Sequence, residues 1–181
     1  MLAFCRGRED AFVELYRRHR DRIVSFCRRM LGDQAQAEEA AQDVFLKLYR
    51  TRESYEPRSR FSTFIYRIAS NHCLNLAARL DTRLTDRRGA ERQHGKPADQ
   101  LGELSRKELR AHLDHALAKL PERQRAALLL VHYEGLSYRE ACESIDVSEP
   151  AIKSLIHRAR MTLMQELSAL RGEAQEVEHA V

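Results

Sequence analysis

The sequence predicts an all-α protein in which a flexible linker joins two small helical domains, the second of them built around a helix-turn-helix. Through most of the chain, apolar residues recur every three or four positions, which is the period of one helix face. Residues 81–105 lack this period and separate two groups of periodic segments. In the second group, a short segment, a three-residue turn and a longer segment follow one another, as in a helix-turn-helix. We therefore expect domains at residues 9–80 and 106–170.

The composition excludes several classes of protein. Of 181 residues, 43% are hydrophobic and 32% are charged, which is enough apolar material for modest helical cores. The longest apolar run, Ala126 to Val131, is far shorter than the ~20 residues of a membrane span, so we expect no membrane insertion. No apolar stretch of the kind that signal peptides contain precedes Arg6, and the 4 cysteines form no CxxC pair. We expect a cytoplasmic protein without a cofactor or a metal site.

Basic residues are concentrated in two places. Residues 1–80 carry 15 basic and 10 acidic side chains, and residues 57–80 contain arginines but no acidic residue. Residues 150–165 also contain basic side chains and no acidic ones. Both segments would attract the phosphate groups of nucleic acids, although either could instead be ordinary solvated helix surface.

The first helix is predicted from residues spaced alternately four and three positions apart, which lie on one helix face. They are Phe12, Tyr16, His19, Ile23, Phe26 and Met30. Gly32 suits the left-handed residue that ends many helices. Asp33, with Gln36 three residues later, resembles a capping box that begins a second helix ending near Arg50. That helix has an apolar stripe of Ala37, Ala41, Val44, Phe45 and Leu48, and the side chains expected on or near its exposed side are Glu39, Gln42, Asp43 and Lys47.

A third helix is predicted over residues 62–80, after a loop that contains Pro57. Polar residues four apart form a stripe on it: Thr63, Arg67, Asn71, Asn75 and Arg79. Because Asn is unfavourable inside helices, two of them in one stripe need solvent or a ligand. Amide and guanidinium groups beside aromatic rings suit unpaired bases, and the rings nearby are Tyr55, Phe61, Phe64 and Tyr66. We expect at least one of the two phenylalanines to be a core residue instead.

Residues 81–105 contain Gly89, Gly95 and Pro97 and few large apolar side chains, so they are predicted to be the linker. Fully extended, the 25 residues would span roughly 80 Å, and as a flexible coil roughly 28 Å. The linker would therefore allow the two domains to lie well apart.

Two helices are predicted at the start of the second domain. Ser105 and Glu108 resemble a capping box for the first, whose apolar face is Leu109, Leu113, Ala116, Leu117 and Leu120. Pro121 fits the first turn of the second helix, which would continue to Tyr133 and end at Gly135.

The helix-turn-helix follows. Ser137 and Glu140 form another capping-box pattern before a short helix over residues 138–145, and Asp146 begins the turn, where its side chain tolerates a left-handed conformation. A long helix over residues 149–170 comes next. In a helix-turn-helix this second helix enters the major groove. Its polar face consists of Ser148, Lys153, Ser154, His157, Arg158 and Arg160.

Taken in order, several segments resemble the extracytoplasmic-function (ECF) group of bacterial RNA polymerase sigma factors. In the first domain they are Glu39-Ala-Ala-Gln42-Asp43-Val-Phe45 and Phe61-Ser-Thr63-Phe64-Ile-Tyr66-Arg67-Ile-Ala-Ser-Asn71. In the second domain they are Leu120-Pro121-Glu122-Arg123-Gln124-Arg125, Gly135-Leu136-Ser137-Tyr138 and Lys153-Ser154-Leu155-Ile156-His157-Arg158-Ala159-Arg160. The resemblance covers about residues 9–80 and 105–170, with a linker of the family's length between them.

The resemblance implies a subunit without catalytic activity that binds core RNA polymerase and promoter DNA. The first domain would bind the core enzyme through Glu39, Gln42, Asp43, Phe45 and Lys47. It would bind melted, single-stranded minus-10 DNA through Tyr55, Arg60, Phe61, Arg67, Asn71 and Asn75. The second domain would bind duplex minus-35 DNA through Arg123, Ser148, Lys153, Ser154, His157, Arg158 and Arg160. The family also suggests an anti-sigma factor as a partner, for which the sequence has no identifying motif.

The chain departs from the family pattern in ways that concern DNA specificity. Leu155 stands where many members have Arg, and Phe64 replaces a common Trp. Cys142 and Glu143 replace a usual Ile-Ala pair, and Pro150 occurs early in the recognition helix. The resemblance therefore does not predict the preferred promoter sequence.

Two other functions are compatible with parts of the sequence. A helix-turn-helix regulator with an N-terminal helical sensing domain explains residues 105–170 equally well, but not the polar stripe of the first domain. Such a regulator would bind duplex DNA without core polymerase. An enzyme is favoured only by His112 and His115, whose spacing suits a metal but which no third ligand accompanies at a useful spacing.

Overall fold

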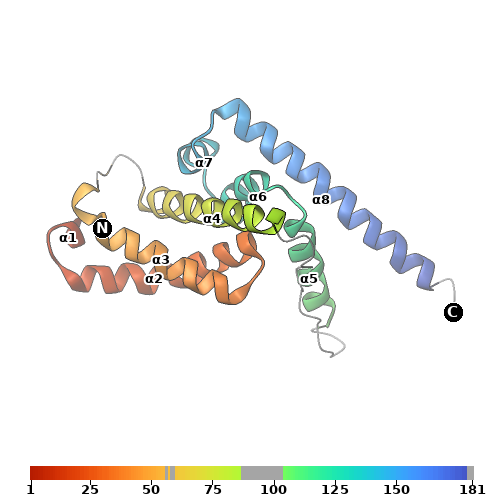
Figure 1. Cartoon of the computed structure of the whole chain (residues 1–181), viewed down its shortest axis with the longest axis horizontal. Coiled ribbons are helices and arrows are strands. Elements are labelled where there is room, and N and C mark those ends of the chain that lie inside the picture. The colour runs from red at the N-terminus through yellow and green to blue at the C-terminus, as the bar shows by residue number, and fades with distance from the viewer. Residues whose placement is uncertain (56, 58–59, 87–103, 179–181) are drawn as a thin grey trace.

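The computed structural model describes residues 1–55, 57, 60–86 and 104–178, and this part of the chain contains eight α-helices and no strand (Figure 1). The first domain contains α1 (Leu2–Cys5), α2 (Glu9–Leu31), α3 (Gln34–Arg50), a short 3-10 turn (Arg52–Ser54) and α4 (Phe61–Asp86). The second contains α5 (Leu104–Ala118), α6 (Glu122–Leu128), a π-helical turn (Leu129–Tyr133), α7 (Tyr138–Ile145) and α8 (Glu149–Glu178). The predicted all-α fold is confirmed.

The helices of the first domain pack where the apolar periodicity predicts. Ile23, Phe26, Val44, Leu48 and Ile65 are fully buried among α2, α3 and α4. The turn between α2 and α3 also forms as expected: Gly32 is left-handed with φ 77°, and the Asp33 carboxylate accepts a hydrogen bond of 2.8 Å from the backbone N–H of Gln36.

Helix α1 was not predicted, and its position depends on aromatic contacts. The Phe4 ring is fully buried, with ring-centroid distances of 5.0 Å to Phe12 and 5.3 Å to Tyr49. A helix of four residues is too short to show a period in the sequence. It forms because Phe4 covers the end of the α2–α3 pair.

The helix-turn-helix has the expected local structure. Ser137 and Glu140 form both hydrogen bonds of the capping box at the start of α7, and Asp146 ends that helix in a left-handed conformation with φ 52°. The side chains of Ile145, Ile152 and Ile156 are buried between α7, α8 and their neighbours. These buried isoleucines therefore fix the orientation of α8 relative to α7.

Helix boundaries differ from the prediction at several points. α4 continues to Asp86, six residues beyond the predicted end, because no Gly or Pro occurs before Gly89. α5 begins at Leu104, so Ser105 lies inside the helix rather than at its cap. α8 continues past Gly172, since one glycine costs a helix only about 1 kcal/mol. The remaining predicted linker, residues 87–103, lies outside the described residues.

The two domains pack against each other instead of lying apart. α7 packs on α4, and α2 contacts both α5 and α6 (Figure 1). Buried residues of both domains form one continuous apolar cluster. Among the described residues, none of the helices is both long enough and apolar enough to cross a membrane.

Candidate polymerase and nucleic-acid interfaces

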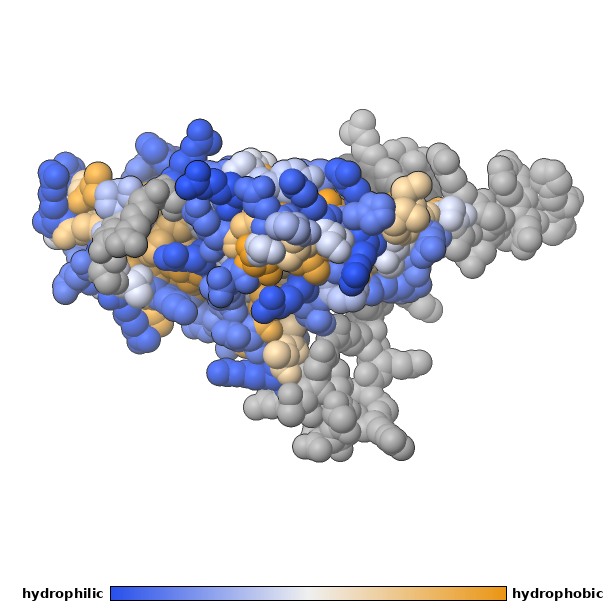
Figure 2. Space-filling view, turned by 90° about the horizontal axis from the view of Figure 1, so that it is seen from above, coloured by the Kyte–Doolittle hydropathy of each residue, from blue (hydrophilic) through white to orange (hydrophobic). Residues whose placement is uncertain are grey.

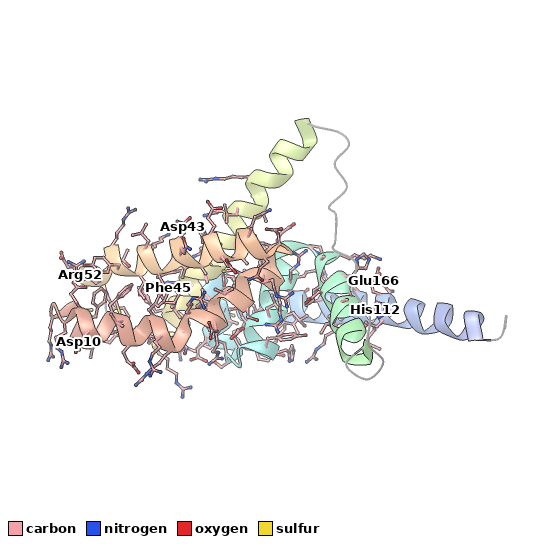
Figure 3. All side chains as sticks on the ribbon, turned by 90° about the horizontal axis from the view of Figure 1, so that it is seen from below. Asp10, Asp43, Phe45, Arg52, His112 and Glu166 are labelled. Carbon is pink, nitrogen blue, oxygen red and sulfur yellow. The ribbon has the colours of Figure 1, made fainter. Side chains whose placement is uncertain are left out.

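The polar side of α3 is open, as predicted. Glu39, Gln42, Asp43 and Lys47 are all exposed, and Figure 3 shows Asp43 and Phe45 on this helix. Phe45 differs from the others because its side chain is only 3% exposed. Its ring lies edge-on to Tyr16, with centroids 4.8 Å apart. Phe45 therefore packs beneath this surface and contributes little solvent-accessible area to it.

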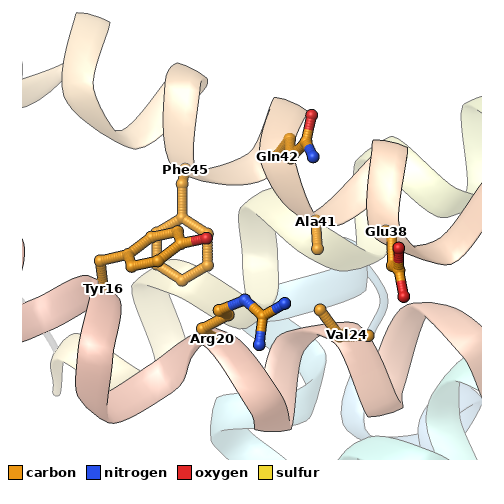
Figure 4. A pocket seen from close by; sticks show the side chains of 7 residues that line it. All are labelled: Tyr16, Arg20, Val24, Glu38, Ala41, Gln42 and Phe45. Carbon is orange, nitrogen blue, oxygen red and sulfur yellow. The ribbon is translucent and has the colours of Figure 1, made fainter.

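Two hollows lie between α2 and α3, next to Phe45. The smaller is lined by aromatic, polar and charged side chains from both helices (Figure 4): Tyr16, Arg20, Val24, Glu38, Ala41, Gln42 and Phe45. The larger is an open groove of about 400 Å³ lined by Phe12, Tyr16, Gln42, Phe45, Leu46 and Tyr49. Leu46 is 45% exposed there and Val13 on α2 is 64% exposed.

Sequence reasoning missed the apolar part of this surface. Leu46 lies outside the apolar stripe of α3. A single exposed apolar residue is not by itself a signal of a partner, because such residues are common on protein surfaces; only the folded structure joins Leu46 to other apolar side chains in one groove. Tyr16, 36% exposed, was assigned to the buried face of α2. The predicted acidic and amide side chains thus border an apolar groove that the prediction did not include.

A third hollow brings the acidic side of α3 close to α4. It has a volume of about 260 Å³ and is lined by Gln36, Glu39, Ala40, Asp43, His72, Leu76 and Arg79. Within it, one Asp43 carboxylate oxygen lies 3.3 Å from His72 Nε2. The predicted core-binding residues and the distal end of the predicted DNA-binding stripe are therefore neighbours.

The stripe on α4 is exposed along most of its length. Arg67, Asn71, Asn75 and Arg79 are all exposed. Thr63 is the exception: it is 2% exposed, and its hydroxyl donates a 3.1 Å hydrogen bond to Glu140 of α7. The second domain thus covers the N-terminal end of the stripe.

Aromatic rings lie beside the start of the stripe. The Tyr55 and Phe64 rings are 4.8 Å apart, and the Arg67 guanidinium lies 5.4 Å from the centre of the Phe64 ring. Phe61 is half-buried against His19, and Arg60 is exposed. We expected at least one of the two phenylalanines to be a core residue; both are partly buried against the apolar core, and both remain partly accessible.

Helix α8, the predicted recognition helix, presents the predicted basic face to solvent. The exposed side chains are Ser148, Lys153, Ser154, His157, Arg158 and Arg160, and Arg123 of α6 is exposed as well. Figure 2, viewed from the side of α7 and α8, shows a largely hydrophilic face. The Ser148 hydroxyl accepts a 3.4 Å hydrogen bond from the Ala151 backbone N–H, so Ser148 also caps the helix.

One of these basic residues has a partner that the sequence did not indicate. Arg160 Nη2 lies 2.8 Å from His132 Nε2, and the Arg160 N–H donates to the neutral ring nitrogen. Partial burial and the Arg160 charge lower the pKa of His132 below its ordinary value of 6.5. His132 therefore holds Arg160 at neutral pH.

In the described residues, no group of three His, Cys, Asp or Glu side chains is arranged to hold a metal ion. His112 and His115 are both exposed on α5. Cys27 and Cys73 are buried next to each other in the first domain, where the hydrogen bond between the two thiols and burial raise the pKa of Cys73.

Both domains match known protein families. Residues 15–83 match the family described as sigma-70 region 2, and residues 110–163 match the family described as sigma-70, region 4. The match of the first domain favours a sigma factor over the alternative of a regulator with a sensing domain. It also leaves the weak enzyme hypothesis without support.

Curated relatives of similar length agree with both matches. The chain is 33% identical to RNA polymerase sigma factor CarQ of Myxococcus xanthus, over 96% of this chain and 98% of the relative. It is 32% identical to RNA polymerase sigma-H factor of Pseudomonas aeruginosa, over 93% and 92%. It is 29% identical to ECF RNA polymerase sigma factor SigW of Bacillus subtilis, over 91% and 93%.

Solved structures share the fold. The sigma factor RpoE of Bartonella quintana, solved in complex with the anti-sigma factor NepR, matches with a TM-score of 0.73 and 23% identity, over 87% of this chain and 97% of that one. CnrH, solved in complex with the cytosolic domain of CnrY, matches with a TM-score of 0.66 and 24% identity, over 91% and 92%.

Proposed function

The chain belongs to the ECF group of sigma-70-type RNA polymerase sigma factors, and we propose that its two domains divide promoter recognition between the surfaces described above. As a sigma factor it binds core RNA polymerase and directs transcription initiation, and it is not itself an enzyme. Its place of action is then the cytoplasm, where polymerase and chromosome are. What remains to be assigned is which side chains perform each task.

The first domain binds core polymerase through α3 and the groove beside it. Glu39, Gln42, Asp43 and Lys47 supply polar contacts, and Phe45 supports the groove in which Leu46 is exposed. Exposed apolar side chains that line a groove and are bordered by charges are typical of a protein-binding surface. The partner surface would combine apolar side chains with basic groups that pair with the α3 carboxylates.

Asp43 provides a direct test of this surface. Charge reversal in Asp43→Lys should reduce co-purification with core polymerase by about tenfold or more, because it places a like charge against the expected basic partner. Asp21→Lys makes the same charge change at an exposed position of α2 and should leave co-purification unchanged. An equal loss in both variants would show a nonspecific charge effect and contradict the assignment.

The α4 stripe binds the melted minus-10 strand. Arg67, Asn71 and Asn75 offer a cation and two amides in a row on one exposed face, with the Tyr55 and Phe64 rings at its start. Single-stranded nucleic acid is bound by such combinations, in which bases stack on rings while their edges bond to amides. Arg60 and Phe61 lie at the beginning of the same helix and extend the surface.

The α8 face binds the minus-35 duplex. Its basic side chains are exposed while Ile152, Ile156 and Ala159 are buried on the opposite side, so the helix is anchored with its polar face outward. This is the arrangement in which a helix-turn-helix places side chains in the major groove. Arg123 of α6 and Ser148 border the face and are suited to phosphate contacts.

One observation carries this division of labour: a single chain exposes an amide-and-arginine stripe on α4 and a basic helix-turn-helix face on α8. The decisive experiment is promoter-dependent run-off transcription by core polymerase with and without the chain. Discrete transcripts that require the chain support the proposal. Tight binding to an operator duplex without polymerase, together with no transcript, would contradict it.

An anti-sigma factor is a further candidate partner. The Bartonella quintana protein was solved with one bound, and this chain shares its fold. Affinity purification of the tagged full chain from its own cells, with the core polymerase subunits as internal reference, tests this. A small stoichiometric partner that excludes core polymerase from the same complex would support it, and recovery with core polymerase alone would not.

A further inference from the structure

The π-helical turn after α6 places a histidine beside the polar face of α8. A hydrogen bond of 3.0 Å from the Glu134 backbone N–H to the Leu129 carbonyl closes the turn. Leu129 and Leu130 are fully buried, so the backbone of the turn is anchored in the core. His132 remains exposed, and its Nε2 lies 2.8 Å from Arg160 Nη2. Single turns of this kind within helices often occur at functional sites.

The backbone of Arg160 is fixed by its neighbours on α8. Ile156 and Ala159 are 1% and 0% exposed, so this part of the helix cannot move without disturbing the core. The Arg160 side chain extends from this fixed point and is exposed. Arginine side chains have many rotamers, and ordering one of them on binding costs free energy. The hydrogen bond to His132 orders the Arg160 side chain before any ligand is bound.

The acceptor of this hydrogen bond is neutral. Partial burial and the Arg160 charge lower the pKa of His132 below its ordinary value, so the ring is uncharged at neutral pH. A carboxylate in the same place would also hold the guanidinium, but it would offset the charge of Arg160 and repel phosphate groups. The contact engages one N–H of the guanidinium and leaves the remaining donors for another partner. Arg160 is therefore held in place with its charge intact.

Lys153 shows a different kind of contact on the same face. Its Nζ lies 4.0 Å from a carboxylate oxygen of Glu149, one turn earlier on α8, and both side chains are mostly exposed. Exposed ion pairs within one helix contribute little, and the carboxylate offsets part of the lysine charge. The contact of Arg160 differs in both respects, because its partner comes from a separate element and carries no charge.

We propose that His132 is a positioning residue for minus-35 DNA binding, which holds the Arg160 guanidinium ready to contact a phosphate group of the duplex. The proposal rests on the function assigned above to α8. Arg160 lies about three turns after the start of α8 at Glu149, whereas base edges are contacted by N-terminal residues of a recognition helix. A phosphate is therefore the expected partner of Arg160. Because the side chain is already ordered, less conformational freedom is lost on binding.

The test measures binding of the full chain to a minus-35 duplex, taken from a promoter at which the chain directs run-off transcription. His132→Ala removes the acceptor and should weaken binding about three- to tenfold, the cost of ordering one long side chain. The salt dependence of the affinity should stay the same, because Arg160 still neutralises the same phosphate in the complex. Arg160→Ala removes the cation, so it should weaken binding and also lower the salt slope by about one.

Three further variants separate positioning from a general structural role. His132→Gln keeps a neutral acceptor that can reach Arg160, so it should bind like the unmodified chain; a loss as large as in His132→Ala would contradict the proposal. In a chain that carries Arg160→Ala, adding His132→Ala should have no effect, since the group that it positions is absent. His112→Ala is the matched control, because His112 is exposed on α5 of the same domain (Figure 3), and it should leave affinity and salt dependence unchanged.

The outcomes distinguish the positioning role from the proposed function. Normal affinity of His132→Ala together with weak binding by Arg160→Ala would overturn the positioning role and leave the assignment of α8 standing. An equal loss from His132→Ala with and without Arg160 would also overturn it, because His132 would then act independently of Arg160. If Arg158→Ala weakens binding and Arg160→Ala does not, the positioning role alone is wrong. If neither arginine matters, the assignment of α8 is wrong as well.

Discussion

The two helices that carry the proposed DNA-binding surfaces are buried in different ways. α8 packs on α5, α6 and α7, all of its own domain, and its basic face is complete without help from the first domain. α4 packs on α2 and α3 but also on α7, where Thr63 bonds to Glu140, and its Tyr66 hydroxyl bonds to Glu134 just before α7. A surface completed within one domain is available in the free protein. The accessibility of a surface that both domains form changes when the two domains separate.

The largest expected effect comes from Arg125, whose buried guanidinium serves both domains. Its side chain donates to the Met30 carbonyl near the end of α2, and to the Ala118 and Leu120 carbonyls at 2.6 and 2.9 Å. Arg125→Met would leave buried carbonyls without donors and should lower the free energy of unfolding by about 3–5 kcal/mol. Urea denaturation followed by circular dichroism measures this.

Arg123 provides the control for that measurement. It lies two residues earlier on α6 and is exposed, so Arg123→Met should change the free energy of unfolding by no more than about 0.5 kcal/mol. Similar losses in both variants would mean that Arg125 contributes no more than a surface arginine. The difference between them measures how much the buried guanidinium of Arg125 contributes to the free energy of unfolding.

The next effect is confined to α8. Arg158→Ala should weaken binding to a minus-35 duplex by about 1–3 kcal/mol if Arg158 contacts bases, or lower the salt dependence of binding if it contacts phosphates. Stability should not change, because the side chain is exposed. Gln165→Ala, further along the same helix and also exposed, is the control. Unchanged affinity and salt dependence in Arg158→Ala would contradict the recognition-helix assignment.

A smaller effect is expected on α4. Asn71→Ala removes an exposed amide from the stripe, and the loss of one hydrogen bond of about 1 kcal/mol should slow open-complex formation roughly fivefold. Core binding should stay near normal, because Asn71 lies outside the α3 surface. Transcription from duplex and premelted templates measures this, with Gln34→Ala, an exposed amide at the start of α3, as control. Equal activity of Asn71→Ala and the unmodified chain on both templates would contradict the assignment of Asn71 to minus-10 DNA binding.

The features predicted correctly from sequence are those determined by neighbouring residues. The Ser137–Glu140 capping box, the left-handed Asp146 and the exposed side of α3 follow from residues within a few positions of each other. The same holds for the polar face of α8. Local hydrogen bonds and helical periodicity are determined by residues close together in the sequence. These elements could therefore be predicted.

The features that were missed depend on contacts between distant residues. In the sequence, nothing distinguishes Arg125 from a surface arginine. Its burial depends on the packing of the C-terminal ends of α2 and α5, whose carbonyls accept its hydrogen bonds. Tyr66 was assigned to an aromatic platform, but its ring is 2% exposed and its hydroxyl reaches Glu134. A linker of 25 residues allowed both separated and closed domains, and the choice between them depends on side chains on both sides of it.

The smallest expected effect concerns pH, and it compares one histidine in each domain. The pKa of His132 is lowered by partial burial and by Arg160, and the pKa of His19 is lowered by burial and by Arg22 and Arg18. Below its ordinary value of 6.5, the unfolded chain binds more protons at these sites than the folded chain does. Stability is therefore greatest above that pH and decreases as the pH falls towards the lowered values.

Urea denaturation at pH 7.5 and 5.5 tests the contribution of each histidine. His132→Gln should lose less stability between the two pH values than the unmodified chain, because the proton uptake at this site is gone. His19→Gln, in the first domain, should likewise lose less stability between the two pH values than the unmodified chain. Among the described contacts, none is a hydrogen bond from an arginine to the His19 ring. Identical pH dependence in all three proteins would contradict both lowered pKa values. A change confined to His132→Gln would contradict the lowered pKa of His19 and leave that of His132 standing.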